Sequence, residues 1–117
     1  MIFLAVVFTS TIAFLYSKNP DTGARLNPPS GLTAEAGDQK VLLKWQATNS
    51  YAEADYNIYQ STDRNGPFHR IATSKERIYT VANLTNGITY YFKVTASLNA
   101  AAESVGSNQV AITPGPL

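Results

Sequence analysis

The sequence predicts an all-β domain, a sandwich of seven short strands, with an apolar segment in front of it. From Leu32 onward, apolar and polar residues alternate with a period of two, which is typical of strands that bury one face. Turn-forming clusters separate these runs, as in AGDQ, DRNGP, TNG and VGSN, and none of the runs has a helical period. Seven half-buried strands at this spacing are typical of two sheets packed face to face.

The segment at residues 1–17, MIFLAVVFTSTIAFLYS, contains no charged side chain. As a helix it would be about 25 Å long, against a hydrocarbon core of roughly 30 Å. We expect a short hydrophobic helix that serves as a transmembrane anchor, because no Lys or Arg precedes the run as it would in a signal peptide. A cleaved signal peptide is the alternative, with TIA (11–13) as its cleavage site.

Residues 18–29 are predicted to be a linker, and the folded domain is predicted to span residues 30–117. The linker contains three prolines and a glycine and shows no apolar periodicity. Its last two residues, Pro28 and Pro29, favour an extended and stiff chain.

The seven predicted strands are 32–36, 40–47, 55–61, 67–73, 77–84, 89–96 and 108–114. In each strand the alternation assigns one set of side chains to the interior. From the second strand to the seventh these are Val41, Leu43 and Trp45; Tyr56 and Ile58; Phe68 and Ile71; Tyr79, Val81 and Leu84; Tyr90, Phe92, Val94 and Ala96; and Val110 and Ile112. The same alternation turns Asn57, Tyr59 and Tyr91 outward.

Several of these segments, in this order, resemble a fibronectin type III domain of the bacterial type. PPSGLTAEAGDQKVLLKW resembles the opening of the domain, with Trp45 as the tryptophan of strand B, and ADYNIYQSTDRNGPFHRIAT is similar to strands C and C′. LTNGITYYFKVTA resembles the E–F corner, where Leu84, Gly87 and Tyr90 match the leucine, the glycine and the corner tyrosine. ESVGSNQVAITP is similar to the closing strand G, so the resemblance covers about residues 28–115.

The resemblance implies a seven-stranded immunoglobulin-like sandwich with a conserved pattern of core residues. We therefore assign Trp45, Tyr56, Leu84, Tyr90 and Phe92 to the structural core, where each large apolar side chain contributes roughly 1.5–3 kcal/mol. The corner position also implies a hydrogen bond from the Tyr90 hydroxyl to nearby backbone. The sequence departs from the family in the F–G loop, where Ala102 replaces a common glycine and stiffens the chain.

Length and composition exclude several classes of function. The chain has 117 residues, no cysteine and one histidine, so we expect no disulfide, no thiolate nucleophile and no metal site built on sulfur or imidazole ligands. The net charge is +1 and the nine basic residues are scattered, which predicts no nucleic-acid surface. We expect no cofactor.

No set of residues predicts catalysis. His69 falls in a short edge strand, where an exposed surface residue is the simpler interpretation. Glu53 and Asp55 are spaced to share a strand face, but a solvated strand edge explains them. Asp63 and Asn65 lack the spacing of a calcium loop and are typical of a turn.

We therefore expect a non-enzymatic interaction subunit in which residues 1–17 hold the domain in a lipid bilayer. Tyr59, Tyr91 and Lys93 are the predicted contact surface, for other protein subunits of a membrane complex or for self-assembly. The alternative is a secreted carbohydrate-associated or adhesion module with a cleaved signal peptide. Lys18 and Arg25 weakly favour a cytoplasmic domain. The family resemblance instead favours the periplasmic or extracellular side, which we adopt.

Overall fold

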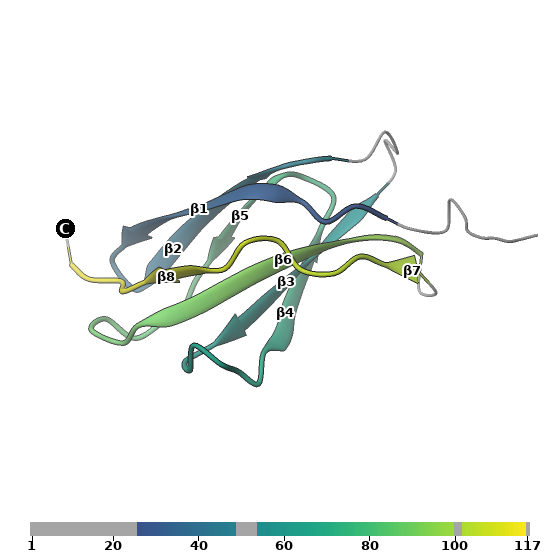
Figure 1. Ribbon diagram of the computed structural model, residues 1–117. Coiled ribbons are helices and arrows are strands. Elements are labelled where there is room, and N and C mark those ends of the chain that lie inside the picture. The colour runs from purple at the N-terminus through teal and green to yellow at the C-terminus, as the bar shows by residue number, and fades with distance from the viewer. Residues whose placement is uncertain (1–25, 49–53, 100–101, 117) are drawn as a thin grey trace, which may run out of the picture.

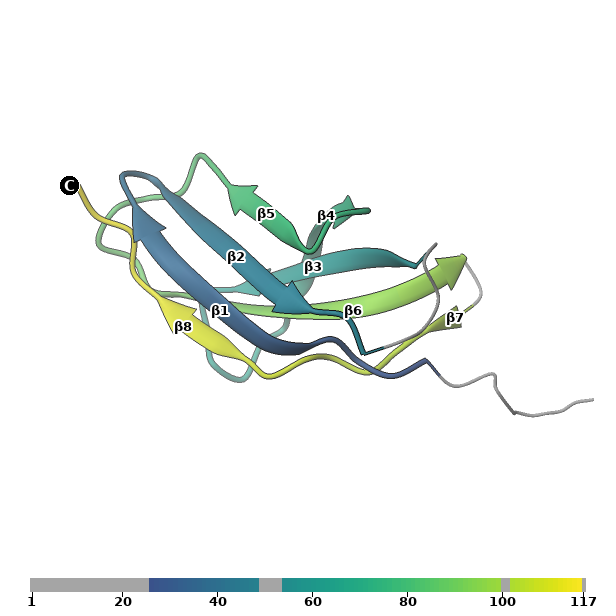
Figure 2. The same cartoon turned by 90° about the horizontal axis from the view of Figure 1, so that it is seen from above.

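The computed structural model describes residues 26–48, 54–99 and 102–116, and these residues form two antiparallel sheets packed as a sandwich (Figures 1 and 2). The smaller sheet contains β1 (Ser30–Gly37), β2 (Lys40–Gln46) and β5 (Ile78–Val81), in the order β1-β2-β5. In the larger sheet the order is β4-β3-β6-β7, and β8 also pairs with β6. Its strands are β3 (Asp55–Ser61), β4 (His69–Ser74), β6 (Tyr90–Asn99), β7 (Ala102–Glu103) and β8 (Val110–Ile112). The predicted all-β sandwich is confirmed, with eight described strands instead of seven.

The helix and anchor predicted for residues 1–17, and most of the predicted linker, lie outside the described residues. Among the residues that are described, no helix is long and apolar enough to cross a membrane.

The core lies between the two sheets and contains the side chains that the alternation turned inward. The smaller sheet contributes Val41, Leu43 and Trp45, and the larger sheet contributes Ile58 and Phe92, each at most 2% exposed. The other large members of the buried cluster are Leu32, Tyr56, Val81, Leu84, Tyr90 and Val94. All five residues assigned to the structural core are therefore buried in the described domain.

Two aromatic pairs fill the middle of this core. Trp45 and Tyr56 meet across the two sheets edge to face, with ring centroids 5.6 Å apart and an interplanar angle of 63°. Tyr90 and Phe92 lie on the same strand face with centroids 6.4 Å apart. Aromatic pairs in such arrangements add about 0.5–1.5 kcal/mol beyond the burial of their area.

The fourth predicted strand was wrong about which side chains face inward. Ile58 pairs with Ala72 and Tyr59 with Arg70, so Ile71 is an extra residue in a β-bulge and is 41% exposed. Phe68 precedes the strand and lies against Lys93 instead of entering the core. A bulge inserts one unpaired residue and interrupts the alternation, which a strict period of two does not anticipate.

The strand β7 was missed because it consists of only two residues. Ser97 pairs with Glu103 and Asn99 with Ala102, with a register shift between the two pairs. A strand this short carries no alternation, and Ala102 was predicted to lie in the F–G loop.

The loop between β5 and β6 is held by the Tyr90 hydroxyl. Its oxygen accepts a hydrogen bond from the backbone N–H of Thr85 at 3.0 Å. The predicted contact between this hydroxyl and nearby backbone is present, with the hydroxyl as acceptor instead of donor. The neighbouring N–H of Leu84 donates to the carbonyl of Gln39 at 3.0 Å, which joins the loop to the β1–β2 turn. These bonds fix the corner at which the chain passes from one sheet to the other.

A single side chain joins β1 to the segment that leads into β8. Asn108 accepts a hydrogen bond from the backbone N–H of Leu32 and donates one to the Leu32 carbonyl, both at 2.9 Å. Leu32 lies where the pairing of β1 with β2 shifts register, between Ser30 and Thr33. The Asn108 amide thus satisfies both backbone groups of a residue at an irregularity in the ladder.

Trp45→Ala is expected to lower the free energy of unfolding by about 3–5 kcal/mol, because it removes the largest side chain of the core and leaves a cavity. Urea or thermal unfolding of the domain measures the change. Lys44→Ala, at the exposed neighbouring position, is the matched control and is expected to change stability by less than about 0.5 kcal/mol. Equal melting curves for both variants would contradict the core assignment.

Tyr90→Phe is expected to cost roughly 1 kcal/mol, because the ring stays in place while the N–H of Thr85 loses its acceptor. The measurement is the same unfolding curve, combined with hydrogen exchange at the Thr85 amide. Unchanged stability and unchanged protection at this amide would show that the corner hydrogen bond is unimportant.

Candidate contact surface

The outer face of the larger sheet brings the three predicted contact residues together. Tyr59 on β3 is directly opposite Lys93 on β6, and Tyr91 is opposite Ser61 two pairs further along. All three side chains are half-buried, whereas Phe92 between Tyr91 and Lys93 is fully buried. The alternation of β6 therefore separates its core side chains from its outward ones, as the sequence predicted.

Phe68 and Lys93 extend this face toward the β3–β4 loop. The Lys93 ammonium lies over the Phe68 ring, 4.1 Å from its centroid, which is a favourable cation–π distance. The Lys93 stem also runs beside Gly106, where a Cβ would come within 3.4 Å of the Lys93 Cδ. These contacts restrict Lys93, so its charge occupies a defined position on the face.

Next to this surface, the Glu103 carboxylate gathers three hydrogen bonds from two strands. Its Oε2 accepts from the Tyr59 hydroxyl at 2.6 Å, from the Thr95 hydroxyl at 2.5 Å and from the Asn57 amide at 3.2 Å. Asn57 and Thr95 are only 5% and 8% exposed. The carboxylate thus joins the two-residue strand β7 to the centre of the sheet.

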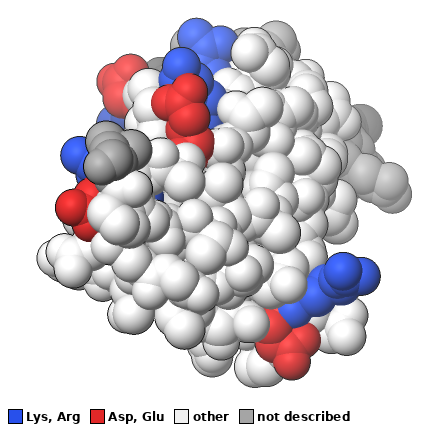
Figure 3. All heavy atoms as spheres, turned by 90° about the vertical axis from the view of Figure 1, so that its left-hand side faces the viewer, with Lys and Arg blue, Asp and Glu red and all other residues white. Residues whose placement is uncertain are grey.

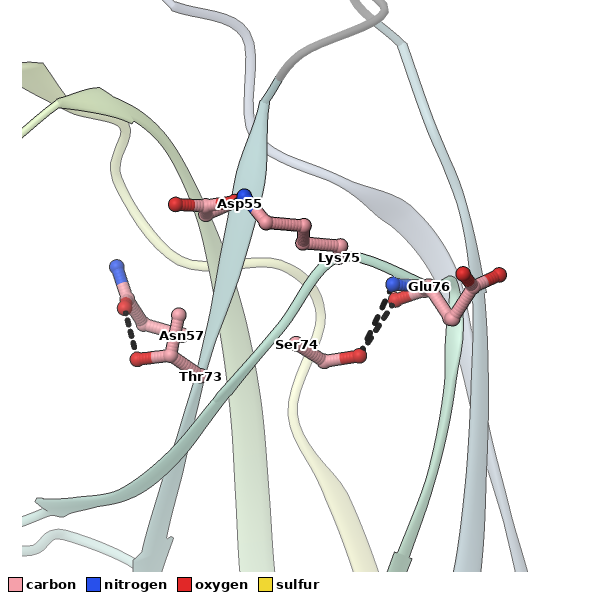
Figure 4. Close-up of polar contacts among 6 residues, drawn as sticks. All are labelled: Asp55, Asn57, Thr73, Ser74, Lys75 and Glu76. Carbon is pink, nitrogen blue, oxygen red and sulfur yellow. Dashed lines mark hydrogen bonds and ion pairs between the residues drawn. The ribbon is translucent and has the colours of Figure 1, made fainter.

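On its other side the Asn57 amide is also satisfied. Its carbonyl oxygen accepts a hydrogen bond from the Thr73 hydroxyl at 3.0 Å (Figure 4), and its NH₂ group also donates to Thr95 at 3.2 Å. Asn57 points to the outer face as predicted, yet it is buried, because its neighbours on β4, β6 and β7 cover it. A buried amide whose donors and acceptor are all hydrogen-bonded is tolerated in the folded state. Loss of one partner lowers the free energy of unfolding, because the unpaired group stays buried.

The hydrogen bonds around Glu103 shift two pKa values in opposite directions. The pKa of Glu103 is lowered, first by the hydrogen bond from Thr95 and then by that from Tyr59, because both favour the ionised carboxylate. The pKa of Tyr59 is raised, mainly because its hydroxyl donates to the same carboxylate. At neutral pH the pair is therefore a carboxylate and a neutral phenol.

Tyr59, Tyr91 and Lys93 were predicted from the sequence, whereas Glu103 was not singled out and Phe68 was wrongly assigned to the interior. Tyr59 was predicted only to point outward, and its hydroxyl is bonded within the domain to Glu103. The only signal for Glu103 is a carboxylate in a loop beside a strand that ends in polar residues. That signal specifies neither the face nor the distance.

The remaining polar residues considered from the sequence serve local structure. Asp55 pairs with Lys75 at 2.8 Å; the Lys75 side chain is 81% exposed, so the pair contributes only about 0–1 kcal/mol (Figure 4). Asp63 accepts the N–H of Asn65 at 2.8 Å and shapes the β3–β4 loop. His69 is an exposed residue of β4, and Glu53 lies outside the described residues.

The charges on the described part of the chain are dispersed. Figure 3 shows the end of the sandwich near the C-terminus, where the few charged side chains lie toward the rim, positive beside negative. The described residues contain no group of three or more His, Cys, Asp or Glu that could hold a metal ion.

Two antiparallel sheets, a tryptophan buried on β2 and a tyrosine corner before β6 define an immunoglobulin-like β-sandwich module. The chain belongs to the fibronectin type III domain family, whose model matches residues 27–113. This match confirms the family that the sequence resembles.

Two curated relatives of this chain are much larger proteins, of which it matches a small part. Over 98 residues the chain is 39% identical to an amylopullulanase of Thermoanaerobacter thermohydrosulfuricus. The aligned stretch covers 80% of this chain and 6% of that protein. An amylopullulanase of Thermoanaerobacterium thermosulfurigenes is 33% identical over 87 residues, which cover 74% of this chain and 5% of that protein. The chain therefore spans about one-twentieth of the curated relatives that it matches.

Among solved structures, a β-1,2-glucanase from Parabacteroides distasonis aligns with a TM-score of 0.69 and 30% identity, covering 79% of this chain and 13% of that one. A fibronectin type III-like protein from Clostridium thermocellum aligns with a TM-score of 0.61 and 26% identity, covering 76% of this chain and 93% of that one. The same fold thus occurs both within a long enzyme chain and as nearly the whole of a short one.

Glu103→Gln is expected to destabilise the domain at neutral pH, because the amide replaces a charged acceptor of three hydrogen bonds with a weaker one. The pKa of Glu103 is lowered in the folded state, so the carboxylate's contribution to stability is present above the unfolded pKa of about 4.3 and is lost as the pH falls through the folded pKa. The stability difference between the two proteins should therefore shrink with acidification.

Urea unfolding from pH 7 down to pH 3 tests this expectation. Glu35→Gln is the control, since the Glu35 side chain makes no hydrogen bond or ion pair with the described residues. The role of the carboxylate would be contradicted if the loss of stability in Glu103→Gln stayed constant over the whole pH range. A loss equal to that of Glu35→Gln would contradict it as well.

Proposed function

We propose that this chain is an accessory, non-catalytic module that works beside a glucan-degrading catalytic domain. The observation that carries the proposal is the 39% identity to a stretch that makes up 6% of an amylopullulanase. The aligned β-1,2-glucanase supports the same setting, since its name also describes an enzyme that acts on a glucan. A segment that is so small a part of each enzyme suits a supporting role beside a separate catalytic domain.

The outer face of the larger sheet is the contact surface in this proposal. Its rings are those of Tyr59 on β3, Tyr91 on β6 and Phe68 just before β4. Its charges are those of Arg70 on β4 and Lys93 on β6, on either side of β3. A glucan chain has C–H groups on the faces of its sugar rings and hydroxyls around their rims. Aromatic rings suit the former, and charged hydrogen-bonding groups suit the latter.

The rigidity of this face favours binding over flexible linking. Tyr59 is held by Glu103 and Lys93 by Phe68, so ordering these side chains against a partner costs little additional entropy. Tyr91, whose side chain makes no hydrogen bond with the described residues, is the residue best placed to supply new contact.

Tyr91→Ala is expected to weaken binding of the chain to pullulan, because it removes the aromatic contact and leaves the core intact. Affinity electrophoresis in gels with and without pullulan measures the retardation. Ile78→Thr, at a 46%-exposed position of the opposite sheet, is the matched control and should leave the retardation unchanged. Absence of retardation in the parent protein would contradict glucan binding by this face.

A second proposal concerns location, and the uncharged run at residues 1–17 favours it. In this proposal the run anchors the module in a membrane, with the domain on the periplasmic or extracellular side, as one subunit of a larger complex or polymer. A secreted module with a cleaved signal peptide is the alternative.

Removal of residues 1–26 is expected to release the module from membranes without unfolding it, because the family match begins at residue 27 and the buried cluster between the sheets begins at Leu32. Leu26 is buried but is not a member of that cluster. Fractionation of cells that express the full chain or residues 27–117, with the mass of the recovered full chain, provides the measurement. Recovery of soluble protein without its first residues, after expression of the full chain, would overturn the anchor.

A further inference from the structure

The chain contains two Asn-Gly pairs in loops, and their asparagine side chains differ in hydrogen bonding. Asn65–Gly66 lies in the β3–β4 loop and Asn86–Gly87 in the loop between β5 and β6. We propose that Asn65 is a site of spontaneous deamidation that alters the contact surface, whereas Asn86 is protected from the same reaction.

The reaction requires only the chain and water. The backbone nitrogen of the following glycine attacks the asparagine Cγ; an N–Cγ bond forms, the Cγ–Nδ2 bond breaks, and ammonia leaves with the proton from the backbone nitrogen. Water then opens the cyclic imide at either carbonyl and produces aspartate or isoaspartate. Glycine is the residue that permits this attack best, because it has no side chain to obstruct it.

The backbones of the two pairs do not distinguish them. Gly66 donates its N–H to the Asp63 carbonyl at 3.0 Å, and Gly87 donates its N–H to the Pro114 carbonyl at 2.9 Å. Both glycines have positive φ, +81° and +88°. The difference that we propose therefore rests on the asparagine side chains.

Two hydrogen bonds hold the side chain of Asn86. Its oxygen accepts the N–H of Gln39 at 2.7 Å, and its NH₂ group donates to the Asp38 carboxylate at 2.8 Å. The exposed side chain of Asn65 makes no hydrogen bond with any described residue. Asn86 has to break both bonds before its Cγ turns toward the glycine nitrogen, and two hydrogen bonds of about 1 kcal/mol each correspond to a rate about thirtyfold lower.

Modification of Asn65 would reach the contact surface through Phe68. A Cβ on Gly66 would lie 3.1 Å from the Phe68 Cδ1, so the ring packs directly against this glycine. Isoaspartate lengthens the main chain by one carbon immediately before Gly66, and either product adds a carboxylate to a loop that already contains Asp63. The Phe68 ring, over which Lys93 lies, is thereby displaced.

The test follows the intact chain during incubation in mildly alkaline buffer. Mass spectrometry of tryptic peptides 65–70 and 78–93 measures deamidation at each asparagine, with fragment spectra separating Asn86 from Asn83, and isoaspartyl methyltransferase labelling detects the rearranged product. Asn65 is expected to react about thirtyfold faster than Asn86. Equal rates at the two sites, or a faster reaction at Asn86, would overturn the proposal.

Two variants make the test specific to the observed contacts. Asp38→Ala removes one of the two hydrogen bonds of Asn86 and should raise its rate about fivefold while leaving Asn65 unchanged. Asn65→Gln should abolish the product at residue 65. A rate at Asn86 that does not respond to Asp38→Ala would show that side-chain tethering does not protect it.

Discussion

The sandwich depends on the apolar layer between its two sheets, because no backbone ladder and no disulfide joins them among the described residues. Phe92 and Ile58 on one side and Leu43 and Val41 on the other are fully buried, and the Trp45–Tyr56 contact spans the gap between the sheets. Dispersion and hydrophobic burial are not directional, so they hold the sheets together without fixing how the chain crosses between them. Directional hydrogen bonds at the margins of the core fix these crossings. They are made by Tyr90 in the corner loop and by Asn108 beside β1.

On the outer face of the larger sheet, hydrogen bonds take the place of apolar packing. Polar groups are buried there, and each of them needs a hydrogen-bond partner. Asn57 and Thr95 lie on the two central strands, and β7 lies close enough for Glu103 to accept from both. The lowered pKa of Glu103 reflects this convergence of donors. Consequently a two-residue strand with almost no ladder of its own is held by side chains, and the same bonds immobilise Tyr59 at the edge of the proposed contact surface.

Much of the fold could be predicted from the sequence, because burial on one face produces a period of two that the residues record directly. Val41, Leu43 and Trp45 show it without interruption, and Tyr90, Phe92 and Val94 repeat it on the partner sheet. The prediction was wrong at Ile71, where a bulge shifts the alternation by one residue, and it missed β7, whose two residues carry no period. Of the site, the strand register brings Tyr59 opposite Lys93, but the Glu103 contact depends on how a loop returns to the sheet, which no local pattern records.

The two Asn-Gly loops indicate how a module of this kind separates stability from contact. The Asn86 loop carries the corner of the fold, and its side chain is tied to the β1–β2 turn by bonds that also restrain its chemistry. The Asn65 loop lies at the end of the β3–β4 hairpin, where Phe68 of the contact face packs against Gly66. None of the core residues makes a hydrogen bond to this loop within the described domain. A covalent change in the loop therefore leaves the core in place. In our proposal, deamidation of Asn65 can therefore alter the contact surface while the sandwich beneath it remains folded.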